Sequence, residues 1–427
     1  MKGTVKARGA LILDEDQLPT NGAALGACAR RNGGPSPISA TRSRLIVLLL
    51  CLLATSGCAD QRGRDALLMM GDLAAGEGPS RLKAVTPTPS RRAIAYTVEG
   101  RQRSGALYLP GEGAPQAGIV LVPGAVPLGK DDPRLVAFAM TLARVRFAVL
   151  TPELSGYREL QIRPDNSNEI RDAFEHLVER KQLSPGGRAG IAATSYGVGP
   201  AVLAALDEDI RARVRFVLGI GGYYDLRESI RFFTTGYFND AGVERYVQPD
   251  EYGKLVFAKT ALEYLHAAKD RAIIDAMVEA KLKDAAADIS GLAAGLGPEG
   301  LSVYRLLTDT DPRATPALID ALPASMRATI DTLTLKGKDL ARLEGQIILV
   351  HGKNDPLVPY TQSLELARAV PPSQVHVFIL HNILRHVELS FGRVFSRRFW
   401  TEDLPDAWRL YGAISTLLRQ REDEGER

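Results

Sequence analysis

Three side chains that together can carry out nucleophilic catalysis stand far apart in the sequence: Ser195, Asp355 and His386. A serine hydroxyl is a weak nucleophile, and it becomes an effective one when a histidine accepts its proton and a carboxylate orients that histidine. Such a set attacks acyl carbonyls and requires neither a cofactor nor a metal ion. It works only if the fold brings the three side chains together.

The serine stands between an apolar run, residues 189–193, and a helical pattern. The local sequence is Ala193-Thr-Ser195-Tyr-Gly197. On a tight turn from strand to helix, the residues two positions either side of the nucleophile must be small, because larger side chains would collide. Ala193 and Gly197 satisfy this requirement.

The carboxylate follows another apolar run, residues 347–350, in the sequence His351-Gly-Lys-Asn-Asp355-Pro-Leu-Val-Pro359. We expect Asp355 to hold the catalytic histidine and His351 to be structural, at the end of the strand. Asp225, after the preceding strand, is the alternative acid. Its other interpretation is the N-cap of the helix that follows.

Two histidines that could act as the base follow the last predicted strand, within Leu380-His381-Asn-Ile-Leu-Arg-His386-Val-Glu-Leu389. His381 adjoins the strand and would be constrained by its geometry, whereas His386 lies a short loop further on. We therefore expect His386 to be the base, with His381 as the alternative.

These motifs resemble those of the α/β-hydrolase family. The family's nucleophile elbow is written G-x-S-x-G, and Ala193 replaces its first glycine here. The loop from His351 to Pro359 resembles the family's H-G-x-x-D-x-x-V-P loop, and the order Ser, Asp, His is the family's order. The resemblance extends from about Arg92 to Leu418, apart from an insertion. It implies a serine hydrolase that cleaves carboxylic esters or related acyl bonds.

The resemblance also implies an oxyanion hole made of two backbone N–H groups. One belongs to the residue after the nucleophile, Tyr196. The other comes from the loop after the third strand, Val122-Pro-Gly-Ala-Val-Pro-Leu-Gly129. We expect Ala125 to be this second donor, with Val126 as the alternative.

Apolar runs that predict strands alternate with helical patterns along the chain. The runs cover residues 92–98, 104–109, 118–122, 146–150, 189–193, 214–220, 346–350 and 374–380. This alternation predicts an α/β fold with a doubly wound, mostly parallel sheet that helices cover on both faces. Ligands bind at the carboxyl ends of the strands in such sheets, which is where the candidate residues stand.

The strand signal stops between Asp225 and Leu343. We expect a helical cap over residues 226–343, inserted between the sixth and seventh strands. The core is then divided into residues 92–225 and 344–420, with a charged tail over 421–427. Four aromatic residues of the insertion could line an acyl pocket or simply form its own core: Phe232, Phe233, Tyr237 and Tyr264.

The N-terminal region has the pattern of a secretory signal. Arg42 and Arg44 precede an apolar run, residues 45–55, that is too short for a transmembrane helix, and small residues follow it. The segment from Ala54 to Cys58 resembles the lipobox of bacterial lipoproteins. That resemblance implies that residues 1–57 are a leader and signal segment and that Cys58 carries a lipid anchor.

The residue after Cys58 is Ala59, which in a bacterium with two membranes favours the outer membrane, facing the periplasm. Residues 58–91 contain a short helical pattern at 65–75 and then several prolines. We interpret this segment as a tether between the anchor and the globular domain.

The 53 basic and 50 acidic residues nearly balance, so nothing predicts a nucleic-acid-binding surface. The expected partners are a small-molecule acyl substrate and the membrane. Two alternatives to an ester hydrolase remain open. One is a non-catalytic envelope protein that keeps the fold for binding, and the other is an acyltransferase or peptidase on the same fold.

Overall fold

The structure is a computed structural model that describes residues 61–389 and 399–422. The predicted signal segment and Cys58 lie outside the described residues. The described residues belong to one compact unit. Among the described helices, none is long and apolar enough to cross a membrane.

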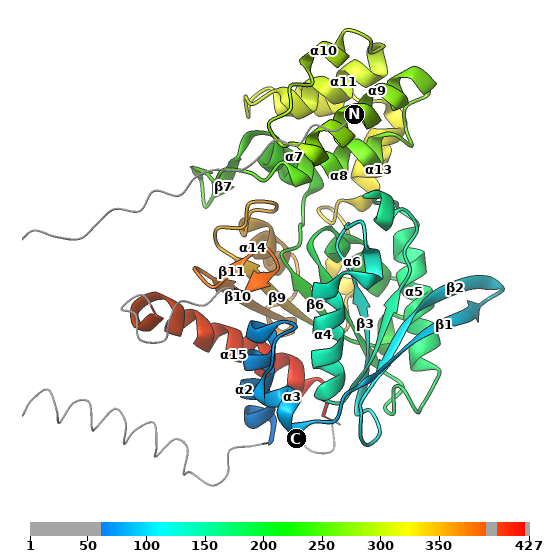
Figure 1. Cartoon of the computed structure of the whole chain (residues 1–427), viewed down its shortest axis with the longest axis vertical. Helices are drawn as coiled ribbons and strands as arrows, with labels where there is room; N and C mark the ends of the chain where they lie inside the picture. Colours follow the sequence, from blue (N-terminus) through cyan, green and yellow to red (C-terminus); the bar gives the residue numbers. More distant parts are fainter. Residues whose placement is uncertain (1–60, 390–398, 423–427) are drawn as a thin grey trace, which may run out of the picture. The chain divides into compact units, whose positions relative to one another are not determined.

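The described residues form an eight-stranded sheet with the strand order β1-β2-β4-β3-β5-β6-β9-β10 (Figure 1). The strands are β1 (Ser90–Val98), β2 (Arg101–Leu109), β3 (Ala117–Val122), β4 (Phe147–Pro152), β5 (Ala189–Thr194), β6 (Val214–Ile220), β9 (Gln346–Gly352) and β10 (Val375–Leu380). β2 pairs antiparallel with both β1 and β4, and all other neighbours are parallel. The predicted mostly parallel sheet is confirmed.

Helices cover both faces of this sheet because its central strands are apolar on both sides. On β3, Val120 and Val122 face one core cluster, and Ile119 and Leu121 face the other; all four are fully buried. The first cluster includes residues of α5 (Asn166–Val178), α6 (Val198–Ala205) and α14 (Thr361–Arg368). The second includes residues of α4 (Pro133–Arg144) and α15 (Leu404–Arg419).

The segment that we interpreted as a tether differs from that expectation. Within 58–91 it forms α2 (Gln61–Ala75) and α3 (Arg81–Val85), and α2 packs against α15. Ala66, Met69 and Leu82 are buried in the second core cluster. The reason is that the apolar residues of the helical pattern lie on one face, which can be buried against the domain.

The expected charged tail, residues 421–427, does not begin at Arg421. Arg421 is buried, and its guanidinium donates to the carbonyl of Val145 at 2.7 Å and to Asp65 of α2 at 2.8 Å. The first residues after α15 therefore belong to the core, because they connect it to α2. Residues 423–427 lie outside the described part.

The predicted cap lies between β6 and β9 and contains α7 (Leu226–Thr235), α8 (Tyr252–Ala261), α9 (Ala268–Lys283), α10 (Ser290–Ala293), α11 (Pro298–Thr308), α12 (Thr315–Asp320) and α13 (Ala324–Leu333). These helices share an apolar core of their own. The cap also contains a hairpin that the sequence did not predict, β7 (Tyr237–Asp240) and β8 (Val243–Tyr246). Its turn residues Ala241 and Gly242 both have positive φ, as a type I′ hairpin turn requires.

Candidate active site

Ser195 lies at the carboxyl end of β5, in a 3-10 turn that leads into α6. Its φ is +54°, a backbone conformation that is rare for residues with a side chain. A Cβ atom on Gly197 would lie 2.5 Å from the carbonyl oxygen of Pro123. The turn therefore tolerates only glycine at this position, which is the steric requirement of a nucleophile elbow.

Asp355 and His386 are brought together by the loops that follow β9 and β10. His386 Nδ1 and Asp355 Oδ2 are 2.8 Å apart. The other carboxylate oxygen, Oδ1, accepts hydrogen bonds from the backbone N–H groups of Leu357, at 2.8 Å, and Val358, at 3.1 Å. The carboxylate is thus fixed in place. It contacts His386 through Nδ1, so Nε2 can face other groups.

The electrostatics of Asp355 suit an orienting carboxylate. Burial by itself raises the pKa of this carboxyl. The charge of His386 and the hydrogen bonds from His351 and His386 outweigh burial and hold the pKa well below its ordinary value. Asp355 therefore stays ionised over the whole range in which an imidazole can act as a base.

His351 has the structural surroundings that we expected. It is fully buried, with Nδ1 2.7 Å from Ser363 Oγ and Nε2 2.9 Å from the carbonyl oxygen of Val358. Nε2 also lies 3.3 Å from Asp355 Oδ2. His351 thus connects the strand end, helix α14 and the Asp355 loop, and both of its ring nitrogens are occupied.

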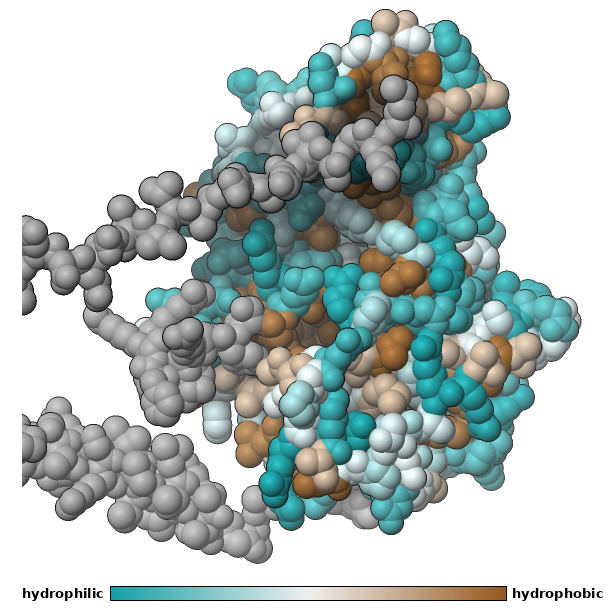
Figure 2. Space-filling model, in the orientation of Figure 1, coloured by the Kyte–Doolittle hydropathy of each residue, from teal (hydrophilic) through white to brown (hydrophobic). Residues whose placement is uncertain are grey.

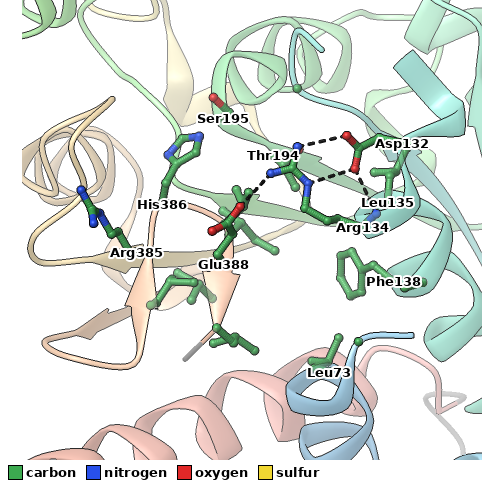
Figure 3. A pocket seen from close by; sticks show the side chains of 18 of the residues that line it. Leu73, Asp132, Arg134, Leu135, Phe138, Thr194, Ser195, Arg385, His386 and Glu388 are labelled. Atoms are coloured by element: carbon green, nitrogen blue, oxygen red, sulfur yellow. Dashed lines mark hydrogen bonds and ion pairs between the residues drawn. The ribbon is translucent and has the colours of Figure 1, made fainter. Parts of the chain in front are cut away.

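Ser195 and His386 line the same cavity (Figure 3). No hydrogen bond joins Ser195 Oγ to His386 in this structure, although both side chains are described. Gly221, at the end of β6, borders the pair: a Cβ there would lie 3.2 Å from His386 Nδ1 and 3.3 Å from Asp355 Oδ2. We did not single out Gly221 from the sequence, although the pair Gly221-Gly222 after a predicted strand could have indicated a close approach there.

The alternative site residues lie elsewhere. Asp225 caps α7, where its side chain accepts from the N–H groups of Arg227 and Glu228, and it pairs with Lys336 at 2.9 Å. His381 does not line the cavity, and its carbonyl oxygen accepts a hydrogen bond from Asn354 at 3.2 Å. Neither residue is placed to complete a set with Ser195.

The two expected oxyanion donors both border the nucleophile. Ala125 and Tyr196 line the cavity together with Ser195, as does the alternative donor Val126. A Cβ on Gly124 would lie 3.3 Å from Ser195 Cβ, so this loop passes directly over the serine. From the cap, the Tyr252 hydroxyl donates to the carbonyl oxygen of Ala125 at 2.9 Å, which ties the loop to α8.

The four cap aromatics do not line the cavity that contains Ser195. Phe233 and Tyr264 border a separate apolar cavity of about 50 Å³. Phe232 packs edge-on against Phe238, and Tyr237 against Tyr246. The structure therefore supports the interpretation that these side chains form the insertion's own packing.

Charged groups stand near the catalytic end of the cavity. Arg134, at the start of α4, pairs with Asp132 at 3.0 Å and with Glu388 at 2.9 Å (Figure 3). Glu388 belongs to a short hairpin, β11 (Leu384–Arg385) and β12 (Glu388–Leu389), and His386 lies in its turn. In the described part of the chain, no cluster of three or more His, Cys, Asp or Glu side chains could hold a metal ion.

No protein-family model matches the chain. A 2-hydroxy-6-oxo-2,4-heptadienoate hydrolase from Pseudomonas putida is 30% identical over 78 residues, which is 18% of this chain and 28% of that protein. The chain thus matches little more than a quarter of the length of this curated relative.

Two solved structures resemble the chain over most of its length. A candidate hydrolase from Legionella pneumophila has a TM-score of 0.51 at 12% identity, covering 80% of this chain and 91% of that one. The rice cell wall degrading esterase LipA from Xanthomonas oryzae has a TM-score of 0.50 at 14% identity, covering 83% and 95%. With the sheet order and the cap, these similarities establish the α/β-hydrolase fold.

Proposed function

We propose that this protein is a serine hydrolase that cleaves carboxylic esters through an acyl-enzyme. The observation that carries the proposal is the 2.8 Å contact between His386 and the buried Asp355, in the cavity that also contains Ser195. The positive φ of Ser195 at the end of β5 adds to it, because strained backbone of this kind concentrates at functional sites.

In the proposed mechanism, Ser195 Oγ attacks the acyl carbonyl while His386 Nε2 accepts its proton. Asp355 holds the imidazole through Nδ1 and stabilises the cation that forms. The backbone N–H groups of Ala125 and Tyr196 stabilise the oxyanion, and the leaving alcohol takes the proton from His386. Water then releases the acyl group by the same steps. Catalytic hydrogen bonds are often long without substrate, so the missing contact between Ser195 and His386 is compatible with this mechanism.

The test is labelling with a fluorophosphonate, followed by peptide mapping and assays with p-nitrophenyl esters. We expect the label on Ser195, and we expect Ser195→Ala to lose both labelling and ester hydrolysis. Ser290→Ala, at an exposed position of the cap, should keep both. A folded wild-type protein that neither takes the label nor hydrolyses any ester would favour a binding protein. Products acylated on an added alcohol or amine would instead favour an acyltransferase.

We also propose that Cys58 carries a lipid anchor in the bacterial cell envelope, at the outer membrane facing the periplasm. The support is the small-residue sequence before Cys58 and the position of α2, which begins three residues later. In cells fed labelled palmitate, we expect Cys58→Ser to lose the label and to leave the membrane fraction. The matched control, Cys28→Ser, should keep both. A wild-type protein without label would overturn this proposal.

A further inference from the structure

The cavity at Ser195 continues far into the domain. Its volume is about 1180 Å³, above the range of about 300–1,000 Å³ that is usual for small-molecule sites. From Ser195 and His386 it extends between one face of the sheet and the helices α2, α4 and α15. Figure 3 shows Leu73 of α2 and Phe138 of α4 at the side away from Ser195, and Figure 2 shows brown hydrophobic surface in a hollow beside α4.

The walls of this space are apolar along several elements. α15 contributes Leu410, Ala413, Ile414 and Leu417, whose spacing places them on one helix face. The sheet contributes Leu218 of β6, Val350 of β9 and Leu380 of β10. Residues at such positions normally close a core against each other. Here they are buried in the second core cluster and also border the cavity that contains Ser195.

The charged groups are distributed unevenly. Arg134, Glu388 and His386 stand at the catalytic end, where the leaving group would be. The acidic residue at the α2 wall, Asp72, is buried and already has protein partners. Its carboxylate accepts from Thr141 at 2.7 Å and pairs with Lys83 at 3.1 Å. A ligand that reaches this wall therefore meets no unpaired charge.

A second cavity, next to the cap, is much smaller. The cavity between cap and core, bordered by Phe233 and Tyr264, is only about 50 Å³. The larger space for an acyl group attached to Ser195 therefore lies towards α2 and α15.

We propose that the space bordered by α2, α4 and α15 binds the acyl chain of the substrate, and that the substrate is an ester of a long-chain fatty acid. This inference rests on the proposed serine hydrolase function. A long chain would bury its own methylenes against these apolar walls, and each buried methylene adds to binding, whereas a short acyl group would gain little from them. Helix α2 is then a part of the substrate site.

Binding can be measured apart from catalysis with Ser195→Ala and a fluorescent analogue of palmitate. We expect saturable binding that unlabelled palmitate displaces and butyrate does not. In the same background, Leu73→Trp should weaken binding about tenfold or more, which corresponds to excluding roughly two methylenes. Leu67→Trp is the matched control on α2, because Leu67 is 57% exposed and lies outside the cavity; it should leave binding unchanged.

Turnover provides a second readout in the enzyme with Ser195 intact. The ratio of kcat/KM for p-nitrophenyl palmitate to that for the acetate should fall in Leu73→Trp and stay constant in Leu67→Trp. Should Leu73→Trp not fold, Ala137→Phe on α4 narrows the same space. Hydrolysis of short esters without palmitate binding would overturn the acyl-chain site but not the proposed hydrolase function. Absence of all hydrolysis and labelling would instead contradict the proposed function.

Discussion

At the scale of single residues, the proposed mechanism depends on the contact between His386 and Asp355. Asp355 makes hydrogen bonds to two backbone N–H groups and contacts two histidines, and it is 1% exposed. A carboxylate in this position fixes the tautomer of the imidazole, so that Nε2 is free to accept the serine proton. The charge of Asp355 matters here more than its shape.

Asp355→Asn tests this argument. We expect kcat to fall on the order of 10³- to 10⁴-fold with little change in KM, because an amide allows the wrong tautomer of His386. Steady-state kinetics with one p-nitrophenyl ester are sufficient. Asp225→Asn is the matched control, since asparagine caps a helix as well as aspartate does, and kcat should not change. Equal losses in the two variants would contradict the assignment of the acid.

At the scale of elements, α2 is the part of the fold that differs most from the sequence-based prediction. A short helical pattern followed by glycine and prolines is typical of linkers. The sequence alone does not show that this helix packs against α15. Met69 is 1% exposed in the core cluster that joins α2, α4 and α15, whereas Met70 is only partly buried. The structure thus makes α2 a part of the domain.

Truncation at these two neighbouring positions measures how firmly α2 is packed. We expect Met69→Ala to lower the free energy of unfolding by about 2–4 kcal/mol, the usual cost of removing a large core side chain. Met70→Ala should cost clearly less. Urea denaturation of the domain provides both values. Equal, small effects would mean that α2 does not stay packed in solution.

The strands, the cap position and the candidate catalytic side chains could be predicted because each depends on a local pattern. The buried strands are continuous apolar runs, and Ser195, Asp355 and His386 each follow one of them. The β7–β8 hairpin was missed because its strands have four residues each, too few for a period to emerge. The cavity was beyond prediction, since it depends on how far apart α2, α4 and α15 lie.

At the scale of the whole molecule, one buried histidine predicts a pH dependence of stability. Burial, with a smaller contribution from Arg180, lowers the pKa of His176 to about 4, from an ordinary value of about 6.5. Its ring packs against Tyr96, with centroids 4.4 Å apart. The folded protein thus holds His176 neutral at a pH where the unfolded chain binds a proton.

Because of this difference in protonation, the folded protein becomes less stable as the pH falls. Neutral His176 makes its full contribution to the free energy of unfolding above about pH 6.5. This contribution is lost as the pH falls towards about 4, because the unfolded state takes up the extra proton. We expect a loss of about 2 kcal/mol over this interval. His176→Phe, which keeps a ring beside Tyr96, should reduce the slope of stability against pH there. An unchanged slope, measured by urea denaturation at several pH values, would contradict this.

The central claim is that His386, held by Asp355, activates Ser195. The most direct test is the rate at which a fluorophosphonate labels Ser195 in the wild-type protein, in His386→Ala and in His381→Ala, followed by mass spectrometry. We expect a loss of at least about 10³-fold in His386→Ala, in line with the cost of removing a triad member, and a near wild-type rate in His381→Ala. The reverse order, or equal rates in all three proteins, would contradict it.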